Sequence, residues 1–216
     1  MYARRVLFPF ILSCLTSTVI ANAYVESGTI SENQLKIEYP LIYTDNTSSQ
    51  NTINSDIANI VYEMKQNYDN GQYYSANMRY EVTYEDSDVV SILLHNYAVK
   101  SPGAAHGSVW YTGLVYNKHT GNRIPLENYV NIQSADQIQY GLLDNVLYSY
   151  NANGQRNFFY QQTGWSVEYI SQNYILSGYG RIDLIYQPYS IGPFAFGPYR
   201  VMFTPKAIDY FNRLNS

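Results

Sequence analysis

The chain has 216 residues and a formal net charge of −4, with 13 basic and 17 acidic residues. This balance excludes the basic surface with which proteins bind nucleic acid. The only cysteine is Cys14, so a disulfide framework and a cysteine-based metal site are excluded as well. Tyrosine is unusually frequent, at 25 residues. Its rigid apolar ring with a polar tip suits binding surfaces, although we expect most of these tyrosines at half-buried strand positions.

Residues 1–23 have the three parts of a cleavable secretory signal peptide. Arg4 and Arg5 form the positive start, residues 6–20 are largely apolar, and Ala21-Asn22-Ala23 supplies an A-x-A cleavage site. A retained membrane anchor is disfavoured, because the apolar stretch is shorter than the ~20 residues that a spanning helix needs. We therefore expect no stable membrane span after cleavage.

A second processing route competes with this cleavage. The residues that end at Cys14 loosely resemble a lipobox, in which the cysteine is acylated and becomes the N-terminus, but the apolar run before Cys14 is short. Cleavage near Ala23 is favoured, and it predicts an extracytoplasmic domain, periplasmic or secreted. The loss of Arg4 and Arg5 leaves 11 of the 13 basic residues against all 17 acidic ones. Such a surface would attract a cationic partner.

Residues 24–100 predict a strand, a helix and a hairpin. Residues 24–34 have no clear period and are expected to be a polar lead-in, whereas Leu35 to Pro40 alternate as an opening strand. Two alternating segments, 78–84 and 89–99, predict a hairpin that packs on the helix. The helix itself is predicted by apolar residues at helical spacing, namely Ile53, Ile57, Ile60, Val61, Met64 and Tyr68.

The boundary between two halves is expected at Ser101-Pro102-Gly103, so that residues 101–216 form the second half. The chain lacks the βαβ alternation of nucleotide folds. The predicted fold class is α+β, an antiparallel sheet with packed helices in two closely associated halves. The elements predicted for the second half are a strand over 109–117, a helix over 134–150, a shorter helix over 166–170, a hairpin of 174–176 with 181–187, a strand over 199–203 and a helix over 205–214.

Three strings of the second half resemble a known bacterial family. They are the GAAHG loop at 103–107, the segment VYNKHTG at 115–121 with IPL at 124–126, and the segment IYQPYSIGPFAFG at 185–197. In this order they are similar to the motifs of a widespread extracytoplasmic domain, found in the RsiV anti-sigma factor and in front of the catalytic domain of the PdaC peptidoglycan deacetylase. Residues 24–100 resemble the companion domain that precedes it. Ala104 departs from the family, which has a second glycine there.

The resemblance implies a binding domain and not an enzyme. In RsiV the domain is a sensor that binds lysozyme, and in PdaC it is an accessory to a separate metal-dependent catalytic domain, whose ligand motif has no counterpart here. The leading hypothesis is therefore an exported, non-enzymatic cell-envelope binding module with lysozyme-like muramidases as partners. The alternative is binding of peptidoglycan or another glycan by exposed aromatic side chains. A third hypothesis is a hydrolase that uses His106.

The hydrolase hypothesis lacks a partner for His106. Catalysis there needs a nucleophile or base within hydrogen-bond reach, and the sequence has neither a G-x-S-x-G motif nor an available thiol. We expect His106 to be structural, joining its loop to the sheet by hydrogen bonds. Gly103 and Gly107 are expected to provide backbone geometry that a side chain would block.

The sequence shows no recognisable metal site. The spacing of His95, His106 and His119 matches no zinc-binding pattern. The acidic turn at residues 85–88 lacks the glycine and the distal glutamate of a calcium loop. We therefore expect no metal and no cofactor.

The best candidate for a binding surface is the aromatic, proline-rich segment from Tyr186 to Tyr199. Its prolines and glycines make it hard for all of its rings to enter a core. The alternative is an internal plug, in which the rings cap the sheet, and the sequence leaves both open. The candidate binding residues are Tyr189, Phe194, Phe196 and Tyr199.

Overall fold

The structure is a computed structural model that describes residues 24–162 and 164–216. The expected signal peptide, with Cys14 and the cleavage site, lies outside these residues. Among the helices of the described ranges, none is both long enough and apolar enough to cross a membrane. The described chain forms two sheets with three α-helices, so the α+β class expected from the sequence is confirmed.

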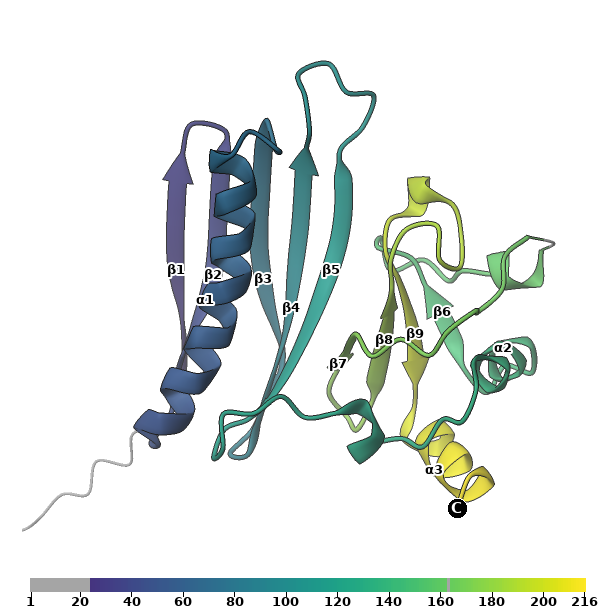
Figure 1. Ribbon diagram of the computed structural model, residues 1–216. Coiled ribbons are helices and arrows are strands. Elements are labelled where there is room, and N and C mark those ends of the chain that lie inside the picture. Colours follow the sequence, from purple (N-terminus) through teal and green to yellow (C-terminus); the bar gives the residue numbers. More distant parts are fainter. Residues whose placement is uncertain (1–23, 163) are drawn as a thin grey trace, which may run out of the picture.

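The first sheet has five strands in the order β1-β2-β3-β4-β5. All neighbours are antiparallel except β2 and β3, which pair in parallel over three residues. Helix α1 lies across one face of this sheet (Figure 1). The bounds are β1 Tyr24–Glu32, β2 Leu35–Tyr43, α1 Thr47–Asp69, β3 Ser75–Glu85, β4 Val89–Val99 and β5 Ser108–Asn117.

Helix α1 confirms the predicted amphipathic helix. The Asn46 side chain caps its start by accepting hydrogen bonds from the backbone amides of Ser48 and Ser49. Its buried face packs on strand residues such as Leu35, Ile42, Val90 and Ile92 in one apolar core. The helix contributes Ile53, Ile57, Val61 and Met64 to that core.

Strand β1 corrects the expectation of a polar lead-in at residues 24–34. It pairs with β2 along its whole length, from Tyr24 opposite Tyr43 to Glu32 opposite Leu35. Most of its side chains are exposed on both faces, because β1 is the edge of the sheet. An edge strand of this kind carries no hydrophobic alternation, which is the signal that sequence analysis needs.

The second sheet has four antiparallel strands in the order β6-β9-β8-β7. Its inner face packs on α2 and α3 around Leu184, Val201, Phe203 and Phe211. The predicted hairpin, the strand over 199–203 and the closing helix are confirmed. The bounds are α2 Ala135–Leu143, β6 Tyr148–Tyr150, β7 Tyr174–Leu176, β8 Ile182–Tyr186, β9 Tyr199–Phe203 and α3 Pro205–Leu214, with single 3₁₀ turns η1 Leu126–Asn128, η2 Phe159–Gln161 and η3 Phe194–Phe196.

Two helix predictions in this half are wrong. The helix expected over 134–150 ends at Leu143, where Asn145 takes a positive φ of 57° and the chain turns into β6. Residues 166–170 contain no helix. Val167 is instead buried in the second core, and its amide donates to the side chain of Gln139.

Strand β5, which we assigned to the second half, belongs to the first sheet. It pairs with β4 from Ala98 opposite Ser108 to Val89 opposite Asn117. The first sheet therefore extends beyond the expected boundary at residue 100, and the chain leaves it only after Asn117. Residues 100–107 form the hairpin loop that joins β4 to β5.

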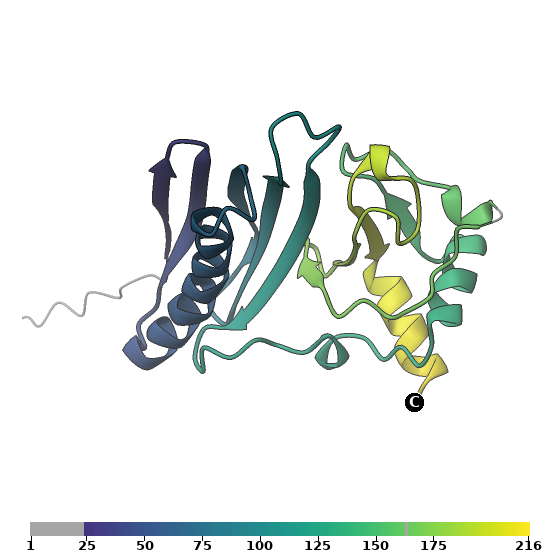
Figure 2. The ribbon, with the colours of Figure 1, turned by 45° about the horizontal axis from the view of Figure 1, so that its top comes forward.

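The two sheets pack directly against each other. Figure 2 shows the resulting layers, with α1 outside the first sheet and with α2 and α3 beyond the second. Leu93 and Tyr111 of the first sheet and Ile175 and Ile185 of the second form a small apolar cluster between the sheets. Polar side chains reinforce it, since Asn173 bonds the backbone of Tyr111 and of Gly113 at 2.8 Å and 2.6 Å.

Candidate binding site

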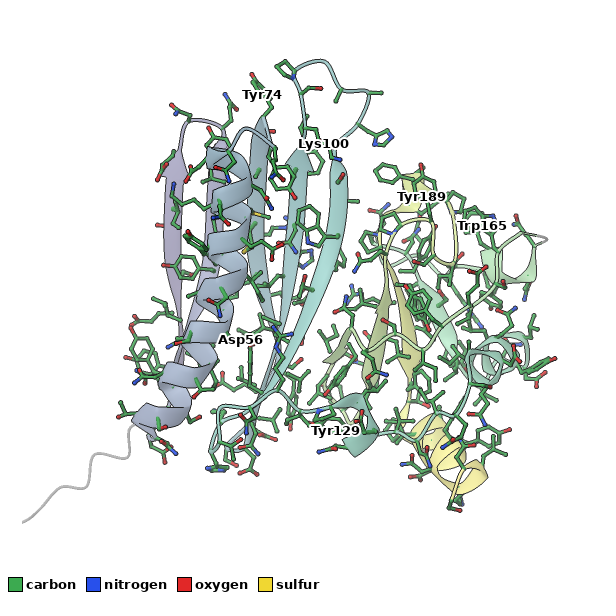
Figure 3. The ribbon with its side chains drawn as sticks, in the orientation of Figure 1. Asp56, Tyr74, Lys100, Tyr129, Trp165 and Tyr189 are labelled. Atoms are coloured by element: carbon green, nitrogen blue, oxygen red, sulfur yellow. The ribbon has the colours of Figure 1, made fainter. Side chains whose placement is uncertain are left out.

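The GAAHG loop and the aromatic segment meet at one end of the molecule. The imidazole of His106 lies against the ring of Phe194, with the ring centroids 4.4 Å apart. The ring of Tyr189 also stacks on Phe194, with the ring centroids 5.5 Å apart and an interplanar angle of 29°. We call His106, Phe194 and Tyr189 the aromatic row. Figure 3 labels Tyr189 at the end of the second half that faces the β4–β5 loop.

The aromatic segment is a tight loop between β8 and β9. Tyr189 takes a positive φ of 71°, and its amide donates to the carbonyl of Gly192. A Cβ atom at Gly192 would overlap the hydroxyl end of the Tyr199 side chain, so any other residue there would have to displace that ring. This geometry directs Tyr189 outward, and its side chain is 62% exposed.

Tyr199 corrects part of the candidate set. Its side chain is buried, its hydroxyl donates to the carbonyl of Pro193 at 2.8 Å, and burial raises its pKa to about 12. Tyr199 therefore holds the segment from inside and cannot contact a partner. The segment thus combines the two alternatives that the sequence leaves open. Tyr199 is an internal ring that caps the sheet, whereas Tyr189 and Phe196 are exposed at the surface.

The glycines of the GAAHG loop have different roles. Gly103 has a φ of 79° with open space around it, so its backbone conformation is what favours glycine. At Gly107 a Cβ atom would lie 2.5 Å from the ring of Tyr97 and 2.7 Å from the carbonyl of Ala98. Close packing on β4 is therefore what requires glycine at this position.

His106 does not join the loop to the sheet as we expected. Its Nδ1 lies 3.1 Å from the carbonyl of Gly107, within its own loop, and its side chain is exposed. Its other close contact is the ring of Phe194. In the described chain no nucleophile or carboxylate makes a hydrogen bond to His106.

The other two histidines have separate partners. His95 on β4 packs on the ring of Tyr111 at 4.4 Å and lies 3.6 Å from Glu81. Burial, with the Arg79 charge, lowers the pKa of His95. His119 pairs with Asp88 at 2.7 Å. Within residues 24–162 and 164–216, no three metal-binding side chains gather at one place.

The acidic turn over 85–88 is a closed hairpin tip. The buried amine of Lys118 donates to Glu85 and to the carbonyl of Asp86, at 3.0 Å and 2.6 Å. The Asp86 carboxylate accepts hydrogen bonds from the amides of Asp88 and Val89. Its oxygens are therefore used within the turn.

A second aromatic feature was not identified from the sequence. Phe196 packs on Phe159 with the ring centroids 5.1 Å apart, and both line a hollow of about 430 Å³. Arg156 and Phe158 also line this hollow, and the guanidinium of Arg156 lies 5.0 Å from the ring centroid of Phe158. The remaining lining side chains are amides, namely Asn151, Gln155, Asn157 and Gln162.

Comparison by sequence gives no assignment. No protein-family model matches the chain, and no curated protein matches it.

The solved structures that are similar to this chain include two DUF3298 family proteins. The first is from Bacteroides fragilis, with a TM-score of 0.61 and 13% identity over 90% of this chain and 96% of that one. The second is from Pseudomonas aeruginosa, with a TM-score of 0.52 and 13% identity over 86% and 94% of the two chains. DUF3298 is also the fold family of the extracytoplasmic domains that the motifs resemble. The chain therefore has the fold of these DUF3298 proteins.

Proposed function

We propose that the protein is an exported, non-catalytic binding module of the cell envelope, and that its partner is a basic, lysozyme-like muramidase. The observation that carries this proposal is the aromatic row, because it joins two motif segments into one exposed surface. Exposed aromatic clusters of this kind form the energetic centres of protein interfaces. Tyr189 is the proposed anchor, since it is the most exposed aromatic residue of the segment.

The charge of the chain supports a cationic partner. Residues 24–216 contain 17 acidic and 11 basic residues, whereas the segment from Tyr186 to Tyr199 contains no charged side chain. An acidic protein around an uncharged aromatic contact would draw in a basic enzyme by long-range attraction and hold it by apolar burial.

The surroundings of His106 support a role without catalysis. A general base needs a hydrogen-bonded partner that orients it, and the contacts of His106 are a carbonyl of its own loop and the ring of Phe194.

Two tyrosine variants test where the partner binds. Tyr189→Asn removes the exposed ring, and asparagine tolerates the positive φ at this position. Tyr179→Asn is the matched control, because Tyr179 is 92% exposed and also has a positive φ, in the β7–β8 turn. Calorimetry with a basic animal-type lysozyme should show roughly tenfold weaker binding for Tyr189→Asn and unchanged binding for Tyr179→Asn. Equal affinities for the two variants would contradict this placement of the surface.

A second candidate function is glycan binding at the hollow beside Phe196. Its combination of phenylalanine rings, amides and Arg156 offers an apolar face and several hydrogen bonds to a sugar. Binding of soluble peptidoglycan fragments that is lost in Phe158→Ala and kept in Tyr189→Asn would favour this site over the aromatic row.

A further inference from the structure

A polar cleft lies between the two sheets, beside the apolar cluster that joins them. It has a volume of about 280 Å³ and is lined by residues of β3, β7, β8 and β9 and by the β7–β8 turn. Its polar walls include Glu81, Ser177, Arg181, Asp183 and Arg200. The cleft is separate from the aromatic row and plays no part in the function proposed above.

The carboxylate of Asp183 is buried there without a full set of partners. Asp183 is 7% exposed, and within the described chain its Oδ1 atom makes no hydrogen bond. Ser177 lines the same cleft, and its hydroxyl makes no hydrogen bond of standard length within the described chain. Unpartnered buried polar atoms are rare in native proteins because each costs free energy. A donor supplied by a ligand would remove this cost.

The guanidinium of Arg200, which lines the same cleft, has donors without acceptors in the described part of the chain. Its Nη1 lies 3.9 Å from the Oδ2 atom of Asp183, which is too far for a hydrogen bond. By contrast, Arg181 donates to the carbonyls of Gly178 and Ser177. Among the described residues, Arg200 makes no side-chain hydrogen bond, so its planar donors are free to bind a carboxylate.

The charges of the cleft select the class of ligand. Two residues with carboxylates, Glu81 and Asp183, and two with guanidinium groups, Arg181 and Arg200, line the cleft. A simple anion would be repelled by the first pair and a simple cation by the second. A small molecule with both charges satisfies both sides, and the volume lies just below the range of about 300–1,000 Å³ that is usual for larger ligands.

We propose that this cleft binds a free α-amino acid, with its ammonium group on Asp183 and its carboxylate on Arg200.

Calorimetry with the purified protein tests this proposal, with L-alanine and D-alanine as probes. Propionate and ethylamine are the matched controls, because each keeps one of the two charged groups. We expect at least one alanine enantiomer to bind at concentrations below about 10 mM and both controls to bind roughly tenfold more weakly or not at all. Absence of binding by both enantiomers would overturn the proposal and leave ordered water as the partner of Asp183.

Variants locate the binding site. Asp183→Asn and Arg200→Gln should each weaken alanine binding roughly tenfold or more, whereas Arg156→Gln, at the other hollow, should leave it unchanged. Circular dichroism checks that each variant folds. If Asp183→Asn does not fold, the binding measurement with Arg200→Gln tests the assignment instead. The half-buried side chain of Arg200 makes no hydrogen bond within the described chain, so its replacement should not disturb the fold. Undiminished binding by Arg200→Gln would refute the assignment to this cleft.

Discussion

His106 and Phe194 pack ring against ring, although they belong to segments that are far apart in the chain. One lies in the β4–β5 loop of the first sheet and the other between β8 and β9 of the second. This contact explains why both segments carry unusual sequences, since each supplies half of one surface. A substitution in either loop should therefore alter the structure or the stability of the other loop.

The first prediction concerns the energy of that contact. In a double-mutant cycle, His106→Ala and Phe194→Ala should show a coupling of about 0.5–1.5 kcal/mol, as aromatic pairs do. Urea unfolding of the four proteins measures it. A coupling of zero would mean that the two loops are adjacent without stabilising each other.

The second prediction concerns Gly107. Gly107→Ala should lower the free energy of unfolding by about 1–3 kcal/mol, because the new methyl group would overlap the carbonyl of Ala98, which cannot move away without disturbing β4. Gly103→Ala meets no neighbouring atom and adds only backbone strain, about 1–2 kcal/mol. The NMR signals of the His106 ring should shift in Gly107→Ala and remain near their wild-type positions in Gly103→Ala. The opposite order would contradict the packing role of Gly107.

The third prediction concerns the attachment of α1 to β5. Arg123 and Tyr116 donate to the same oxygen of Asp56, at 2.6 Å and 2.7 Å. Burial alone would raise the pKa of Asp56, but these hydrogen bonds outweigh it and hold the pKa below its ordinary value. The ion pair of Arg123 with Asp56 is partly exposed, so Asp56→Asn should lower the free energy of unfolding by only about 1 kcal/mol.

The pH dependence of this cost follows from the lowered pKa. The stabilisation is present above about pH 4, the ordinary pKa of an aspartate, and is lost as the pH falls through the lower pKa of the folded state. Thermal unfolding of the wild type and of Asp56→Asn should therefore differ at neutral pH and converge in strong acid. A difference that stays constant with pH would show that Asp56 acts through packing alone.

The fourth prediction concerns Asp183, whose pKa shifts in the opposite direction. Burial raises the pKa of this carboxyl despite the nearby Arg200 guanidinium. Its protonated form favours folding, so its contribution is present below the ordinary pKa of an aspartate and is lost as the pH rises through the folded value. Asp183→Asn should therefore raise the melting temperature at neutral pH, and a lower melting temperature would contradict this sign.

Sequence analysis succeeded where a single periodicity decided the structure. The helical spacing from Ile53 to Met64 places one face of α1 on a core. The alternation at the start of β3 points Ala76 and Met78 toward the same core. It failed at β1, whose edge position leaves no pattern, and at β6, where Asn145 ends the helix by adopting a positive φ.

The candidate site could be predicted only in its parts. The GAAHG loop and the aromatic segment were each identified from their residues, but their contact depends on how the two sheets pack. The burial of Tyr199 was likewise undecided, since the same ring suits a surface and a plug. The polar cleft was missed entirely, because Ser177, Asp183 and Arg200 come from separate elements and have no diagnostic spacing.

The most direct test of the proposed function is calorimetry of the protein with a basic animal-type lysozyme at low and at moderate salt. We expect binding near micromolar or tighter, about −8 kcal/mol, that weakens as salt screens the attraction between the two proteins. The loss of affinity between low and moderate salt should be modest, because the contact at Tyr189 and Phe194 is apolar. Absence of binding at both salt concentrations would contradict the proposed partner and leave glycan binding beside Phe196 as the function to test.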